Sequence, residues 1–144
     1  MRTPLHNRLN KSLKDIAYNY LSKFKYGNKS AFHEYIKHDA HTTLSYTNLT
    51  RLAGNDYTNG NVSTYRLCRI IIASIYFNAI YNYDEIPFKS ADDYEKELLG
   101  KTDSEIEAYF DNIDVALSGY SEQEEQLLRE IADENAAFFA EANT

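Results

Sequence analysis

Four polar side chains between Ser45 and Asn55 carry the clearest chemical signal in this sequence. If residues 46–53 are helical, Thr47, Asn48, Arg51 and Asn55 fall within a sector of roughly 100° on one side of that helix. Arginine pairs with guanine, asparagine pairs with adenine, and threonine contacts a thymine methyl group or a phosphate. This set is therefore typical of a helix that reads base edges in the DNA major groove.

Basic residues flank this segment on both sides. We expect them to contact DNA phosphates and so to position the reading helix, because such contacts fix register without carrying sequence information. The candidates are Lys29, Lys37, Arg66 and Arg69, with His38 and His41 adding positive charge at lower pH.

Other chemistries have weaker patterns. His33, His38 and His41 are spaced by five and three residues, which is not the His-x-x-x-His spacing of a helical zinc site, and no second cysteine is present. Cys68 lies in an apolar stretch, as a small core residue would. The sequence has no Gly-rich phosphate loop and no nucleophile motif. We therefore predict no catalytic residues, no metal, no cofactor and no enzymatic activity.

An apolar pattern surrounds the polar segment. Leu44, Leu49 and Leu52 match the spacing of one turn position and two recognition-helix positions in the helix-turn-helix motif. Over about 45 residues of the segment 30–83, the chain resembles the Cro/repressor-like helix-turn-helix proteins common in phages and mobile elements. Asp39 stands at the usual small position of the first motif helix and Thr43 at the usual turn glycine, so the resemblance implies a turn one residue longer than normal.

The charge of the chain divides in the middle. Residues 1–75 hold 11 Lys/Arg and 4 Asp/Glu, whereas residues 76–144 hold 4 Lys/Arg and 18 Asp/Glu. The net charge of −7 thus combines a basic front with a strongly acidic back. We expect a basic helix-turn-helix-like domain over residues 1–86 and an acidic helical region over residues 87–144.

Helix signals cover nearly the whole sequence, and we predict an all-α fold of about seven helices. Thr3-Pro4, Ser30, Ser45 and Ser63 are helix starts. The first, third and fourth of these helices are expected to end near Gly27, at Gly54 and near Tyr83, and Ser30 opens a short helix with Phe32, Tyr35 and Ile36 inward. In the acidic half, Ser90, Thr102 and Ser121 open capping boxes, with Gly100 and Gly119 closing the first two of these helices.

The acidic half also holds candidate interface residues. Its acidity on folded helices is consistent with a mimic of DNA, with a dimer interface, or with a surface that only keeps the protein soluble. Leu128, Ile131, Asn135 and Phe138 follow the spacing of a short dimerising coil. The full set of interface candidates is Tyr94, Tyr109, Phe110, Leu128, Ile131 and Phe138. Tyr94, Tyr109 and Phe110 could equally form the core of the acidic half.

Two functions follow from these patterns. The first is a small regulator that binds double-stranded DNA. It would act as a repressor, with a homodimer binding two operator half-sites. The second is an inhibitor of a nucleic-acid-handling host defence enzyme, acting through the acidic surface. A basic helix-turn-helix head joined to a second helical region is similar in layout to certain phage anti-CRISPR proteins, which implies a Cas9-type target. With no signal peptide and no membrane span, we expect a cytoplasmic protein.

Overall fold

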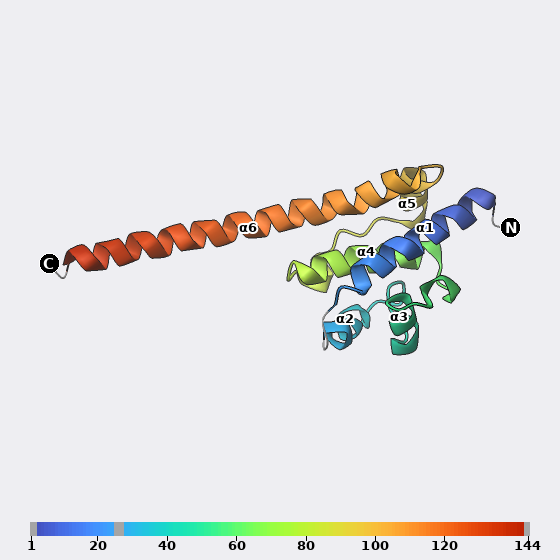
Figure 1. Ribbon diagram of the computed structural model, residues 1–144, viewed down its shortest axis with the longest axis horizontal. Helices are drawn as coiled ribbons and strands as arrows, with labels where there is room; N and C mark the ends of the chain where they lie inside the picture. The colour runs from blue at the N-terminus through green and yellow to red at the C-terminus, as the bar shows by residue number, and fades with distance from the viewer. Residues whose placement is uncertain (1–2, 25–27, 143–144) are drawn as a thin grey trace.

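The structure is a computed structural model. It describes the backbone of residues 3–24 and 28–142, and the side chains of these residues except 119–125 and 137–142. Over the described residues the chain forms six α-helices and two single-turn 3-10 helices, without strands, which confirms an all-α fold of about seven helices (Figure 1). The 3-10 helices are η1, Tyr57–Asn59, and η2, Tyr83–Glu85.

Helix α1, Pro4–Leu21, starts where the sequence predicts. The Thr3 side chain accepts a hydrogen bond from the backbone N–H of His6, and Pro4 occupies the first turn. The helix ends at Leu21, before the expected end near Gly27. Its buried residues face the body of the molecule and include Leu9, Leu13, Ile16, Ala17 and Leu21.

Helices α2 and α3 follow, and both bury the predicted apolar residues. Helix α2, Asn28–Ile36, begins before the expected cap Ser30, and Phe32 and Ile36 are fully buried. Helix α3 is Tyr46–Leu52, and Ser45 caps it by accepting a hydrogen bond from the backbone N–H of Asn48.

Helix α4, Thr64–Asn78, is the centre of the fold. Residues 67–75 are buried without interruption, and the helix packs against α1, α2, α5 and α6. The prediction that it continues to Tyr83 is wrong. The chain leaves the helix at Ile80, whose φ of 62° is left-handed, and the backbone N–H of Tyr81 bonds the carbonyl of Tyr76. These bonds close the helix end, because the left-handed residue turns the chain away from the axis.

The acidic half contains two helices and not the three that were predicted. Helix α5 is Ala91–Leu98, capped by Ser90, and Gly100 follows it with a φ of 83°. Helix α6, Asp103–Ala142, is a single helix of 40 residues that passes through Gly119. A glycine inside a helix costs only about 1 kcal/mol relative to alanine, so the long helix-forming segments on both sides outweigh it.

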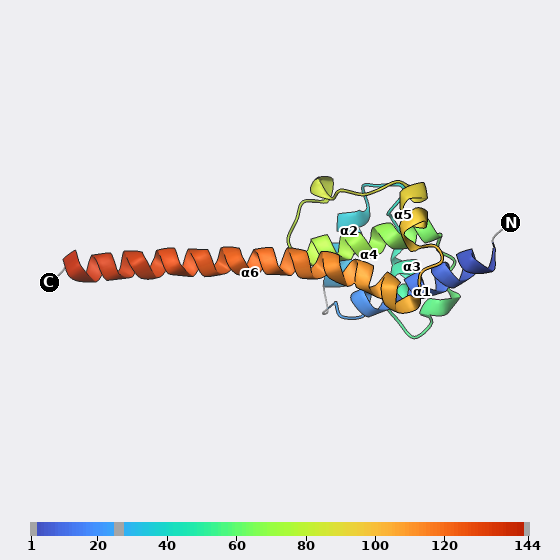
Figure 2. The same cartoon turned by 90° about the horizontal axis from the view of Figure 1, so that it is seen from above.

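Helix α6 has two parts that differ in their surroundings. Its first part packs against α1 and α4. Residues 118–142, which we call the distal arm, extend away from the body and lie beside no other part of the described chain in either view (Figures 1 and 2). Twenty-five helical residues span about 37 Å.

One apolar core joins the basic and acidic regions. Tyr94, Leu98, Ile106 and Phe110 of the acidic half belong to the same cluster of buried side chains as the residues of α1 to α4. The expected boundary at residue 86 therefore does not separate two cores. The part of α6 before the distal arm belongs to the compact body.

Candidate nucleic-acid interface

Helix α3 packs onto the core with its apolar face and exposes its polar face. Leu49 and Leu52 are fully buried and Leu44 is 5% exposed, so the three apolar positions of the motif all anchor the helix in the core. Thr47 and Arg51 are exposed on the opposite side. The helix therefore presents a polar face whose position is set by the packing of its apolar face.

The four predicted base-contacting residues are not equally accessible. Thr47, Arg51 and Asn55 are exposed, Asn48 is half-buried, and Asn55 follows α3 in the turn before η1. The Nε atom of Arg51 lies 3.7 Å from Oδ2 of Asp56, and both side chains are largely in solvent. An exposed pair of this kind is worth little, so the guanidinium can exchange Asp56 for another partner at small cost.

The connection between α2 and α3 is longer than the resemblance implies. Residues 37–45 separate the two helices, and Asp39 organises this segment. Its Oδ1 accepts a hydrogen bond from the backbone N–H of His41 at 2.8 Å, and its carbonyl accepts from the N–H groups of Thr42 and Thr43. The expected turn one residue longer than normal is instead an ordered loop of nine residues.

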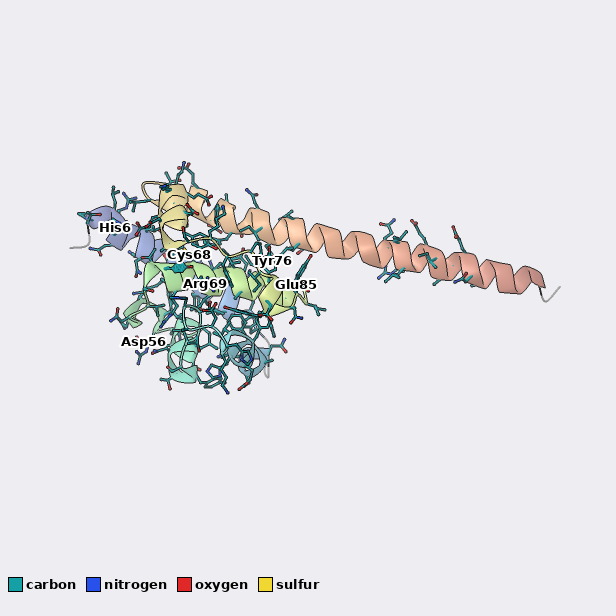
Figure 3. The ribbon with its side chains drawn as sticks, turned by 180° about the vertical axis from the view of Figure 1, so that it is seen from behind. His6, Asp56, Cys68, Arg69, Tyr76 and Glu85 are labelled. Carbon is teal, nitrogen blue, oxygen red and sulfur yellow. The ribbon has the colours of Figure 1, made fainter. Side chains whose placement is uncertain are left out.

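Arg69 is not a phosphate contact. Its side chain comes from α4 into the interior, where it is 9% exposed, and pairs with Asp39 (Figure 3). The guanidinium also donates to Oγ1 of Thr42 at 2.8 Å and to the hydroxyl of Tyr65 at 3.0 Å, and it lies 3.8 Å from the centre of the Phe88 ring. The prediction failed because a cation inside the apolar α4 sequence is buried against a partner 30 residues away.

The network around Asp39 favours its ionised form. Burial opposes the charge, but the backbone hydrogen bond from His41, the hydroxyl of Tyr83 and the Arg69 guanidinium outweigh it and hold the pKa of Asp39 below its ordinary value. The Tyr83 hydroxyl lies 2.9 Å from Oδ2 of Asp39 and 2.7 Å from Oγ1 of Thr42. Groups from α4 and η2 thus lock the loop that leads into α3.

The remaining predicted phosphate contacts have different surroundings. Arg66 donates from Nη2 to the carbonyl of Ala40 at 3.0 Å, so it also braces the α2–α3 loop. Lys37 is exposed, with its Nζ 3.7 Å from Oε2 of Glu34. Lys29 is half-buried near the start of α2. Of the four predicted residues, Lys37 is the most accessible to a phosphate.

Helix α1 contributes basic residues that the motif did not indicate. Arg8 and Lys11 are exposed on its outer side, and Nζ of Lys14 donates to the carbonyl of Thr58 in η1 at 3.4 Å. The ring of Tyr18 stacks on that of Tyr57 with centres 4.5 Å apart, which holds η1 against α1. The spacing of Lys11 and Lys14 by three residues is the sequence signal for this basic edge.

The histidines and the cysteine have structural surroundings. Within the described part of the chain, no three His, Cys, Asp or Glu side chains gather in a group that could hold a metal ion. His33 packs edge-on against Tyr46 of α3, and His41 against Tyr65 of α4. Cys68 is fully buried, and burial raises the pKa of its thiol to about 12.

The interface candidates of the acidic half fall into two groups. The prediction that Tyr94 and Phe110 are exposed anchors is wrong, since they are 2% and 0% exposed and belong to the core. Tyr109 is half-buried against the same core. The side chains of Leu128 and Ile131 are 67% and 47% exposed on the distal arm. Phe138 lies outside the side chains that the structure describes.

No protein-family model, curated protein or solved structure matches the chain. None of the described helices combines the length and the apolar character needed to cross a bilayer.

Proposed function

We propose that this chain is a small DNA-binding regulator that acts in the cytoplasm and inserts α3 into the major groove of double-stranded DNA. The observation that carries the proposal is that α3 is buried on one side and exposed on the other. Leu49 and Leu52 are fully buried, while Thr47 and Arg51 are exposed on the opposite side. A helix that reads base edges in the major groove needs one face packed on the protein core and an accessible polar face opposite.

Within this proposal, Arg51 and Asn48 make the base contacts. Arg51 offers the planar fork that pairs with the two acceptor atoms of guanine, and Asn48 offers the amide that pairs with adenine. Arg51 is exposed on the outer side of α3, and Asn48 is half-buried at the edge of that side. The weak Asp56 partner of Arg51 leaves the guanidinium available. Thr47 and Asn55 contact the adjacent backbone or a thymine methyl group.

The phosphate contacts come from two helices that flank α3. Lys37 and Lys29 approach from α2 and the loop after it, and Lys11 approaches from the outer side of α1. Arg66 and Arg69 contribute indirectly, because their bonds to Ala40, Thr42 and Asp39 hold the loop that orients α3. Counterion release from a few phosphates makes such binding strongly dependent on salt.

A gel-shift titration against the DNA upstream of the protein's own coding region tests the proposal. We expect a shift at micromolar protein that weakens by orders of magnitude between about 50 and 200 mM salt. An unrelated duplex of the same length serves as the control and binds more weakly. The absence of any salt-sensitive shift at micromolar protein would overturn the proposal.

The charge of the acidic half supports a second candidate, an inhibitor of a nucleic-acid-handling host enzyme of the Cas9 type. Exposed acidic side chains on α5 and α6, such as Asp92, Glu107 and Asp111, sit on folded helices, as in a mimic of the DNA phosphate backbone. A cleavage assay with a purified Cas9-type nuclease tests this candidate. Loss of cleavage at stoichiometric protein supports it, and full cleavage at large excess rejects it.

A further inference from the structure

A cavity lies where the N-terminal half of α1 meets the end of α5 and the start of α6. These three segments come together at one end of the body (Figures 1 and 2). The cavity is partly enclosed and has a volume of about 130 Å³. Leu9, Leu98 and Ile106, one from each helix, form what we call its apolar wall, and all three are at most 3% exposed. Because these side chains belong to the packed core, the shape of the wall is fixed.

Two cationic side chains line the same cavity. Arg8 comes from α1, one turn before Ser12, and Lys101 comes from the connection between α5 and α6. Both residues are exposed, so their charged groups lie on the side of the cavity that is open to water. Within the described part of the chain, neither side chain forms an ion pair or a hydrogen bond. Both cations are therefore available to an anionic group of a ligand.

One acidic side chain lines the cavity as well. Oδ1 of Asp103, the first residue of α6, accepts a hydrogen bond from the hydroxyl of Ser12, which is 7% exposed. This bond holds the carboxylate in place, and Oδ2 of Asp103 has no hydrogen-bond partner among the described residues. The carboxylate can therefore accept a further hydrogen bond from a ligand.

The end of helix α6 is not the source of the charge in this cavity. The hydroxyl of Thr102 accepts a hydrogen bond from the backbone N–H of Glu105 at 3.2 Å, and the carboxylate of Glu105 accepts one from the N–H of Thr102 at 3.1 Å. This capping box already occupies two N–H groups of the first turn. The side chains of Arg8, Lys101 and Asp103 therefore determine which ligand fits.

We propose that this cavity binds a small zwitterion, an α-amino acid with a short apolar side chain. Its carboxylate pairs with Arg8 and Lys101, its ammonium group donates to Asp103, and its side chain lies against the apolar wall. A simple anion would meet the carboxylate of Asp103, and a simple cation would meet Arg8 and Lys101. Only a ligand with both charges matches all three side chains, because each mismatched charge would repel the ligand.

The volume of the cavity limits the size of the ligand. An apolar cavity of about 150 Å³ holds benzene. A volume of about 130 Å³ therefore accommodates a branched aliphatic side chain, with the charged end of the ligand at the open side beside Arg8 and Lys101. An indole ring would be too large for the same space. L-valine is thus the appropriate probe.

A nuclear magnetic resonance titration of the full chain tests the ligand class. We expect L-valine to shift the amide signals of Ser12, Gly100 and Lys101 saturably, with a Kd of roughly 1 mM or tighter. 3-Methylbutanoate, which lacks the ammonium group, and 2-methylpropylamine, which lacks the carboxylate, should bind at least about tenfold more weakly. An equal response to inorganic phosphate or 3-methylbutanoate would show an anion site only and overturn the proposal. The absence of saturable shifts with L-valine at about 20 mM would also overturn it.

Two variants test the assigned contacts. Asp103→Asn keeps an acceptor for the hydroxyl of Ser12 but loses the charge, and Arg8→Gln/Lys101→Gln removes both cations from exposed positions. Each should weaken L-valine binding at least about tenfold. Lys96→Gln is the matched control, because Lys96 is an exposed cation of α5 that does not line the cavity. Circular dichroism verifies that each variant is folded. Wild-type affinity in both cavity variants, or an equal loss in Lys96→Gln, would overturn the proposal.

Discussion

Helix α3 and the distal arm are two exposed helical surfaces that differ in what lies behind them. The seven-residue helix α3 packs onto the core through Leu49 and Leu52 and exposes polar side chains on its other side. The distal arm has no neighbouring element among the described residues and exposes Leu127, Leu128 and Ile131. A polar surface fixed by a core suits precise contacts with base edges, whereas an apolar surface without a neighbour suits burial against another protein. The two surfaces are therefore chemically suited to different kinds of contact.

The largest effect distinguishes the covered end of the α6 face from its open end. Phe110→Ala should cost about 3–5 kcal/mol of unfolding free energy, because it opens a cavity in a fully packed core. Leu128→Ala, at the same angular position, should change the stability of the monomer by less than about 0.5 kcal/mol. Urea unfolding monitored by circular dichroism at low protein concentration measures both. Similar losses for the two variants would mean that the distal arm is packed onto the body.

The second prediction concerns the loop that orients α3. Arg69→Ala should cost about 3 kcal/mol, because it leaves the partly buried carboxylate of Asp39 without its guanidinium. The loss should also displace the loop before α3 and weaken DNA binding at protein concentrations where the chain is still folded. Urea unfolding and the gel shift measure the two effects, and Val115→Lys, at a position 69% exposed on α6, serves as a control that leaves both unchanged. Unaltered DNA binding by the folded Arg69→Ala variant would contradict the assigned role.

The acid dependence of stability tests the same loop. Because the pKa of Asp39 is held below its unfolded value of about 3.9, the ionised carboxylate stabilises the fold above that pH, and this contribution disappears as the pH falls through the folded pKa. The stability gap between the wild type and Asp39→Asn should thus be constant above about pH 5 and narrow below pH 4. Urea unfolding at several pH values measures it. An equal gap at pH 3 and pH 7 would contradict the prediction, and the exposed Asp92→Asn serves as the control.

The smallest effect concerns the phosphate contacts beside α3. Lys37→Ala should weaken binding to all DNA sequences alike and lower the slope of log affinity against log salt by about one unit. Fluorescence anisotropy at several salt concentrations measures that slope. Lys96→Ala removes an exposed positive charge from α5 and should leave the slope unchanged. A sequence-dependent loss in Lys37→Ala would instead make Lys37 a base-reading residue.

Local signals in the sequence were sufficient to predict much of the secondary structure of the basic half. The leucine spacing and Ser45 predicted the start of α3 and its buried side, because capping and apolar periodicity act within one or two helical turns. The same reasoning failed at Gly119, where a glycine was read as a helix end although nothing in the fold required the helix to stop. A glycine permits a break, and the flanking residues decide whether it occurs.

Long-range contacts were the part that sequence reasoning could not supply. Arg69 was read as a surface cation, and its buried partners Asp39 and Thr42 are 30 and 27 residues away. Tyr94 and Phe110 were candidates for exposed anchors or for a core of the acidic half, and they belong to one core shared with α1 to α4. In each case the fate of the side chain depends on a neighbour that only the tertiary structure brings close.

Selection of binding sites from randomised duplexes, for the wild type and for Arg51→Ala and Arg51→Lys, tests the role of α3 most directly. We expect a wild-type consensus with a guanine position that both variants lose, at a cost of about 1–3 kcal/mol, because alanine lacks the guanidinium and lysine keeps the charge but not the bidentate fork. The rest of the consensus should remain. An identical consensus for all three proteins, or the failure of the wild type to select any sequence, would contradict the assignment of α3 as the DNA-reading helix.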